Sequence, residues 1–184
     1  MKIPIVNEQD EVIGEEERFT VHQKGLLHRE AHVIFVTSDK KIIFQKRGLN
    51  KETYPGLLDW TVGGHVDSAL DTYEQTATRE AKEETGIDVS GQLILIEKLR
   101  SKSFDSSTNL INNRFTQIFG YLYKGDVKDL KLEDKEALGF EAYSLDQLEN
   151  LSDEDKKKFI GKTISLESID LYKKIIKKVN ENQN

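Results

Sequence analysis

Apolar residues alternate with polar ones or run together in short stretches along much of the chain, and both patterns are typical of β-strands. The apolar residues on either side of the turn-like run 7–10 predict a small hairpin, and those flanking residues 37–41 predict a second one. We expect the strands of the main sheet at residues 32–36, 42–45, 60–64, 93–96, 117–123 and 140–143.

Helical periodicity predicts helices at residues 15–23, 71–85, 145–151 and 166–179. The second of these ends just before Gly86, a residue type that commonly terminates helices. Residues 109–114 are expected in the connection between two strands. Strands on either side of one central helix, with more helices near the end, predict an α+β fold in which helices enclose a mixed β-sheet.

A length of 184 residues suits a single domain spanning residues 1–184. We expect residues 1–28 to form an N-terminal hairpin and short helix, residues 29–150 the core, and residues 151–184 a C-terminal helical extension. No internal repeat or low-complexity linker divides the sequence.

The composition excludes several classes of protein. With 27 Lys and Arg against 33 Asp and Glu, the net charge of −6 argues against a protein that binds nucleic acid polymers. The lack of cysteine excludes a disulfide framework, a thiolate metal site and a cysteine nucleophile. No apolar run approaches the ~20 residues of a membrane span, and the polar N-terminus lacks a signal-peptide core. We therefore expect a cytoplasmic protein without membrane association, whose oligomeric state no motif reveals.

Three glutamates form the most informative pattern in the chain. Glu80, Glu83 and Glu84 are three and four residues apart on a predicted helix, so their side chains share one face. Folding alone does not reward three adjacent carboxylates, whereas a hard divalent cation such as Mg²⁺ or Mn²⁺ does. A glycine pair at residues 63–64 ends the preceding strand, where a bare main chain can approach a metal. A solvated acidic face is the other interpretation of such a charge run.

The segment Arg79–Ile87, together with Gly64, resembles the signature of the Nudix hydrolases, G-x5-E-x7-R-E-U-x-E-E-x-G-U, where U is aliphatic. Every charged and glycine position from Arg79 onward matches. The resemblance implies a Nudix-like α/β/α sandwich with a mixed β-sheet. It also implies a metal-dependent enzyme that cleaves a diphosphate linkage by water attack, in a nucleoside diphosphate derivative or another small organic diphosphate.

The same resemblance assigns roles to individual residues. Glu80, Glu83 and Glu84 would bind the metal, Mg²⁺ or Mn²⁺, and Gly64 would offer its carbonyl. Arg79 would orient a glutamate, which places it in the catalytic group with the three glutamates.

The chain departs from the signature ahead of the helix. Six residues rather than five separate Gly64 from the acidic position, which is Asp71 rather than Glu, and the aliphatic position is only Ala81. Asp71 is equally explained as an N-cap or first-turn acid. The altered spacing favours one alternative function, a non-catalytic Nudix-fold module that binds its ligand without cleaving it.

Further features resemble the Nudix branch that includes type 1 isopentenyl-diphosphate isomerase. The resemblance extends over about residues 5–150 and rests on His28–Arg29, Gln45–Arg47, Lys51, Pro55–Gly56 and Gly64–Val66. It implies that Arg47 and Lys51 lie near the diphosphate, although both also fit as solvated cations beside a hairpin. We assign His65 to the substrate-binding residues with them.

An isomerase-like enzyme is a less favoured alternative on chemical grounds. Gly63 stands where the isomerase has its cysteine, and residues 112–115 carry no carboxylate where it has an acidic segment. Protonating and deprotonating an alkene carbon needs a strong acid and base, which these residues do not provide. His28 and His65 match metal-ligand positions of the isomerase, and His22 lies near a third. Without the acidic partners, we expect these histidines to be structural or to line the substrate pocket.

Glu136 is our candidate for completing the metal shell or acting as general base. It opens a segment, residues 136–148, that loosely resembles a downstream Nudix pattern, E-V-x-x-x-x-W-x-x-x-x-E-L. Glu133 and Asp134 are rivals for the role, as is Glu83 for the base, and an exposed acidic loop is the plainer interpretation.

Overall fold

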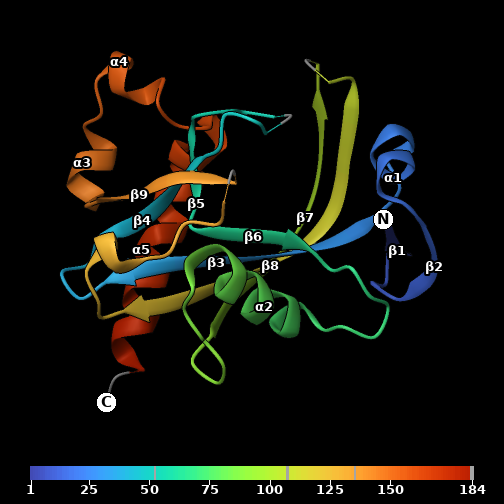
Figure 1. Ribbon diagram of the computed structural model, residues 1–184, viewed down its shortest axis with the longest axis horizontal. Coiled ribbons are helices and arrows are strands. Elements are labelled where there is room, and N and C mark those ends of the chain that lie inside the picture. The colour runs from blue at the N-terminus through green and yellow to red at the C-terminus, as the bar shows by residue number, and fades with distance from the viewer. Residues whose placement is uncertain (52, 107, 135, 183–184) are drawn as a thin grey trace.

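A seven-stranded mixed β-sheet forms the centre of the computed structural model, which describes residues 1–51, 53–106, 108–134 and 136–182 (Figure 1). Its strands run in the order β5-β4-β3-β8-β7, with β6 paired to β3 and β9 to β4. The β3–β8 pair is parallel and the other pairs are antiparallel. The strands are β3 (His28–Thr37), β4 (Ile42–Arg47), β5 (Leu58–Trp60), β6 (Val62–His65), β7 (Ile94–Asp105), β8 (Leu110–Tyr123) and β9 (Ala137–Tyr143).

Helices pack on both faces of this sheet, which confirms the predicted α+β sandwich. On one face, α2 (Tyr73–Thr85) contributes Ala77 and Ala81 to a core cluster that includes Val33 of β3. On the other, α5 (Leu166–Glu181) buries Tyr172 and Ile175 against Ile34. This alternation follows the pleat of β3, whose successive side chains point to opposite faces. The remaining helices are α1 (Arg18–Lys24), α3 (Leu145–Glu149) and α4 (Asp153–Lys156), with 3₁₀ turns η1 (Val127–Asp129) and η2 (Gly161–Ile164).

An N-terminal hairpin, β1 (Lys2–Val6) and β2 (Val12–Glu17), is tied to the core at its turn. The carboxylate of Asp10 accepts hydrogen bonds from Arg29 at 2.7 Å and from the Tyr73 hydroxyl at 2.9 Å, and it also pairs with Lys98. These contacts join the hairpin to β3, α2 and β7. They fix α1, which follows the hairpin directly, beside the sheet.

Three strands are at least twice as long as predicted: β3 begins at His28 rather than at residue 32, and β7 and β8 gain the most residues. β7 pairs along its whole length with residues 110–120 of β8, and the two strands extend away from the body as a hairpin beside α1 (Figure 1). Residues 110–114, which we expected in the connection, belong to β8, and the turn contains Asn109 with φ of 59°. The prediction failed because β7 is largely exposed. Its sequence therefore lacks the alternation of apolar and polar residues by which a half-buried strand is predicted. Cross-strand main-chain hydrogen bonds hold this hairpin together instead.

Smaller differences concern where elements begin. The helix expected from residue 15 begins at Arg18, because residues 15–17 continue β2 against β1. The strand expected at 60–64 is split into β5 and β6 at Thr61, whose hydroxyl accepts from the Phe35 amide at 3.1 Å and donates to the Ile43 carbonyl. No helix among the described residues has the length and apolar character needed to cross a membrane.

Candidate active site

The helix α2 packs closely against β6 because Gly64 of this strand has no side chain. A Cβ built on Gly64 would lie 2.4 Å from Glu80 Cδ and 2.7 Å from Glu80 Oε1, so only glycine lets this carboxylate rest on the strand. The helix itself begins at Thr72, which forms a capping box with Gln75. Asp71 is therefore not the N-cap, and the extra residue before the helix is taken up in the loop.

Glu84 is the more deeply buried of the two glutamates that face inward. Its Oε2 accepts a hydrogen bond from Gln45 Nε2 at 2.8 Å, and the Gly63 main chain lies within reach of the same carboxylate. Burial raises the pKa of Glu84 to about 8, and the charge of Glu80 adds to the rise against the hydrogen bond from Gln45. Burial likewise raises the pKa of Glu80 to about 7, even with Arg79 beside it. Ionising two buried, neighbouring carboxylates costs free energy, and a bound cation would offset that cost. The arrangement therefore favours a cation-binding site.

Arg79 links the remaining acids of the helix. Its Nη1 lies 2.9 Å from Glu80 Oε1 and 3.7 Å from Glu83 Oε2, while its Nη2 donates to Asp67 Oδ2 at 3.0 Å. The guanidinium thus fixes the Glu80 rotamer, the arrangement expected from the sequence. Glu83 is the outermost of the three glutamates, with its side chain 51% exposed.

Oxygen ligands of this kind suit a hard divalent cation. Glu80 and Glu84 reach toward β6, where the Gly64 main chain is bare of any side chain. Mg²⁺ and Mn²⁺ prefer carboxylate and carbonyl oxygens, so the residues fit the ion that the sequence predicts. Glu80 and Glu83 contact Arg79, whereas Glu84 accepts a hydrogen bond from Gln45. The three carboxylates therefore do not converge on one point in this structure.

Of the predicted cations, Arg47 ends β4 and Lys51 follows it on a loop, and the candidate base Glu136 directly precedes β9. Arg47 is turned to the neighbouring strand β5 and to the loop before it, with Nη1 3.2 Å from Asp59 Oδ2 and Nε donating to the Thr53 carbonyl at 3.1 Å. Lys51 forms an ion pair with Glu136. Burial and the neighbouring Arg47 lower the pKa of Lys51, against the attraction of Glu84.

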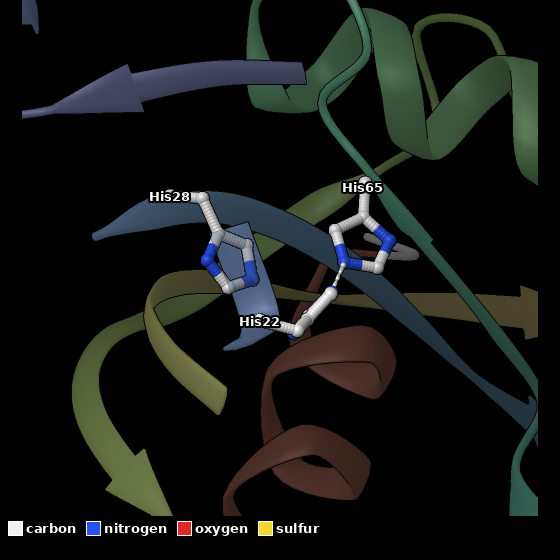
Figure 2. A group of neighbouring side chains, drawn as sticks. All are labelled: His22, His28 and His65. Carbon is white, nitrogen blue, oxygen red and sulfur yellow. Dashed lines mark hydrogen bonds between the residues drawn. The ribbon is translucent and has the colours of Figure 1, made fainter. Parts of the chain in front are cut away.

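His65 lies on the other face of β6 from the glutamates. Its Nε2 is 3.0 Å from His22 Nε2 and 3.5 Å from Glu30 Oε1 (Figure 2). Gly64 faces Glu80, so the next residue along the pleated strand points away from α2. Burial lowers the pKa of His65 to about 3, which keeps the ring neutral near pH 7.

The sequence analysis missed two buried polar residues. Gln45 donates to Glu84, and Glu30 carries a buried carboxylate next to three histidines and Arg114. Burial opposes its ionisation, yet the Arg114 guanidinium and the histidines hold the pKa of Glu30 well below its usual value. A charged residue inside the apolar run of β3 was the signal that could have found Glu30.

Comparisons with known proteins identify the family of the chain. The sequence profile described as NUDIX domain matches residues 26–163. The chain is 30% identical to the uncharacterised Nudix hydrolase CA_C0446 of Clostridium acetobutylicum, over 82% of this chain and 73% of that protein. Other curated relatives are matched over 46% and 58% of their length.

Solved structures show the same fold at lower identity. DR0079 from Deinococcus radiodurans superposes with a TM-score of 0.61 and 24% identity, over 80% of this chain and 86% of that one. The NUDIX domain of Shewanella oneidensis NrtR, solved as a complex with ADP ribose, superposes with a TM-score of 0.57 and 14% identity, over 83% and 88%. The chain therefore belongs to the Nudix hydrolase family. Its members hydrolyse diphosphate linkages and generally use divalent metal ions.

Proposed function

We propose that this chain hydrolyses a diphosphate linkage in a nucleoside diphosphate derivative or another small organic diphosphate, with Mg²⁺, or Mn²⁺ in its place, as cofactor. The observation that carries the proposal is the pair Glu80 and Glu84, held inward against the glycine strand of β6 with raised pKa values. Glu80, Glu83, Glu84 and the Gly64 carbonyl would hold the metal. A bound divalent ion supplies charge neutralisation of the diphosphate and a more acidic water.

Each protein group then has a defined task in the reaction. Water attacks one phosphorus, the bond from that phosphorus to the bridging oxygen breaks, and two phosphate-terminated products leave. Arg79 keeps Glu80 in place through the 2.9 Å contact, and Lys51 meets the diphosphate once its pairing with Glu136 opens. The proton lost by the water passes to a carboxylate, Glu136 or Glu83.

A panel of small diphosphates tests the substrate class. The purified chain would be incubated with Mg²⁺ or Mn²⁺ and with nucleoside diphosphate sugars, dinucleoside polyphosphates, nucleoside triphosphates and prenyl diphosphates. The panel includes ADP ribose because the NrtR domain was solved with it. Release of phosphate or nucleoside monophosphate supports the proposal. Tight ligand binding without any release would instead favour the non-cleaving module, and double-bond migration in a prenyl diphosphate would favour the isomerase.

Substitution of Glu136 tests its assignment as the general base. Glu136→Gln is expected to lower kcat by about 10²-fold or more with little change in KM, because an amide cannot take the proton. Steady-state kinetics over a pH series would measure this. Glu133→Gln and Asp134→Asn, on the same loop, are the matched controls and are expected to keep most activity. If Glu136→Gln stays active while Glu133→Gln does not, the base is misassigned.

A further inference from the structure

Buried polar atoms without a hydrogen-bond partner gather on one face of β3 and β8. Four side chains carry such an atom there, namely His28 (Nε2), Asn112 (Oδ1), Arg114 (Nε) and Thr116 (Oγ1). The three residues of β8 occupy alternate positions, so their side chains point to the same side of the sheet. His28 is the register partner of Arg114 in the parallel β3–β8 pair and points to that side as well. We call these four side chains the polar row.

Packing in the core does not account for the polar row. The helix α5 packs on the same face of the sheet farther along β8, at Ile118 and Gly120. Thr116 is 4% exposed and His28 is fully buried, whereas the Arg114 side chain keeps contact with solvent. A buried polar atom without a partner costs free energy, so several of them side by side indicate a place where water or a ligand completes the hydrogen bonds.

The polar row offers both donors and acceptors. Arg114 Nε can only donate, whereas the Thr116 hydroxyl can donate and accept. His28 Nδ1 lies 3.0 Å from the Leu26 carbonyl and donates to it, which leaves Nε2 as an acceptor. The Asn112 amide presents its oxygen or, after rotation, its NH₂ group. Hydroxyl groups match this mixture, because each of them donates one hydrogen bond and accepts others.

The charges in the polar row are already balanced. Arg114 Nη1 lies 3.0 Å from Glu30 Oε2 and 3.2 Å from Glu30 Oε1, so a buried carboxylate neutralises the guanidinium. A phosphate or carboxylate on the ligand would therefore find no unpaired positive charge here. A hydrocarbon would leave the buried polar atoms without partners, which is unfavourable. A neutral, hydroxylated group fits best.

The polar row lies two strands from the glycine strand of the active site. Glu30 of β3 is paired with Thr116 of β8 on one side and with His65 of β6 on the other. Two strand spacings amount to about 10 Å. Among the described strands, β6 pairs only with β3, and the Glu84 carboxylate lies within reach of the Gly63 main chain. A diphosphate held at β6 would thus have its organic group within reach of β3 and β8.

We propose that the polar row selects the substrate by binding hydroxyl groups of a sugar-like group attached to the diphosphate. The inference rests on the proposed function, which places the diphosphate at the α2 glutamates. Arg114, Thr116 and Asn112 are then specificity-determining residues that favour a hydroxylated group over a hydrocarbon chain. Asn112 and Arg114 lie in the segment where the isomerase branch has carboxylates, so this chain differs from that branch in the polar row itself.

Binding of two matched diphosphates tests the proposal. Ribose 5-diphosphate and isopentenyl diphosphate both carry a five-carbon group, hydroxylated in the first and a hydrocarbon in the second. Isothermal titration calorimetry of the full chain would use Ca²⁺, which also takes oxygen ligands, in place of Mg²⁺. The ligand is checked for cleavage after each titration. We expect ribose 5-diphosphate to bind at least about 100-fold more tightly, because a site built for hydroxyl groups rejects an analogue without them.

Two substitutions in the polar row should reduce that preference. Thr116→Val removes one hydroxyl at nearly constant shape and should weaken ribose 5-diphosphate by about 5-fold, with isopentenyl diphosphate unchanged. Arg114→Lys keeps a positive charge beside Glu30 but lacks the Nε donor, and should weaken ribose 5-diphosphate by about 10-fold or more. Thr76→Val is the matched control. It removes another buried, unpartnered hydroxyl, on α2 and outside the polar row, and should leave both affinities unchanged.

Melting curves establish that each variant is folded, and Thr116→Val carries the test if Arg114→Lys is not. The proposal is overturned if ribose 5-diphosphate does not bind or binds no better than isopentenyl diphosphate. It is equally overturned if Thr116→Val weakens both ligands alike, or if it changes neither affinity, which would mean that the polar row holds only water.

The readout is binding, so the two proposals fail separately. Binding that depends on the polar row, without hydrolysis of any diphosphate in Mg²⁺, would overturn the proposed function and not the assignment of the polar row. Hydrolysis that prefers isopentenyl diphosphate to ribose 5-diphosphate would do the reverse.

Discussion

Glu84→Gln is expected to lower kcat by about 10³-fold or more while leaving the fold intact. Glu84 is the most buried carboxylate of the candidate site and is held by Gln45. Gln has the same shape but cannot carry the negative charge that binds a cation. Product release from the best diphosphate of the panel, measured with saturating Mg²⁺, gives the effect. Glu74→Gln, at an exposed glutamate of the same helix, is the matched control and should keep wild-type activity.

The same substitution should stabilise the metal-free protein at high pH. The pKa of Glu84 is about 8 in the folded chain, against about 4.3 for glutamate in unfolded chains. Between these values the folded state binds more protons, so the free energy of unfolding of the metal-free wild type falls as pH rises. Gln has no such dependence. In EDTA, the melting temperature of Glu84→Gln should therefore exceed that of the wild type at pH 8 and approach it near pH 4.5.

Added Mg²⁺ should reverse this order, because the ion stabilises the ionised wild-type site and not the variant. A variant that is less stable than the wild type at pH 8 in EDTA would contradict the assignment of Glu84 as a buried, charge-strained ligand. Full hydrolysis by Glu84→Gln across several diphosphates would contradict its role in metal binding.

Local signals made α2 and its carboxylates predictable. The helix was placed within two residues at its start and at its observed end, because a capping residue and Gly86 mark its limits. Glu80 and Glu84 are one helical turn apart, so the spacing alone places them on one face. The outer part of β7 had no comparable signal, since its side chains are exposed and it is held by main-chain pairing with β8.

Contacts between residues far apart in the sequence could not be predicted, because they depend on strand pairing and on the packing of α2 against the sheet. Gln45 reaches Glu84 only because β4 lies beside the end of α2, and no spacing along the chain encodes that contact. His65 meets the other histidines through the pairing of β3 with β6, in which Glu30 is opposite His65. The pleat of β6 then separates His65 from Glu80. The grouping of His65 with substrate-binding residues thus remains a prediction, and the structure gives that side chain other neighbours.

Gly64→Ala should lower the activity strongly while leaving the stability of the fold nearly unchanged. The new Cβ would fall 2.4 Å from Glu80 Cδ, closer than carbon atoms approach one another. Gly64 is in a β-strand without positive φ, so alanine fits the main chain and reduces the freedom of the unfolded state. The Glu80 side chain can swing aside, which keeps the cost to folding small. It then no longer rests on the strand.

Displacing a ligand by about 1 Å is enough to cost about 10²-fold in rate. We therefore expect Gly64→Ala to lose about that much kcat and to need more Mg²⁺ for half-maximal activity, with a melting temperature near that of the wild type. Gly139→Ala is the matched control, since a Cβ on this β9 glycine meets nothing within 4 Å, and it should behave as the wild type in both assays. Unchanged activity and Mg²⁺ dependence in Gly64→Ala would mean that the contact of the Glu80 side chain with Gly64 of β6 has no part in catalysis. The metal would then have to be held by Glu83 and Glu84 without the glycine strand.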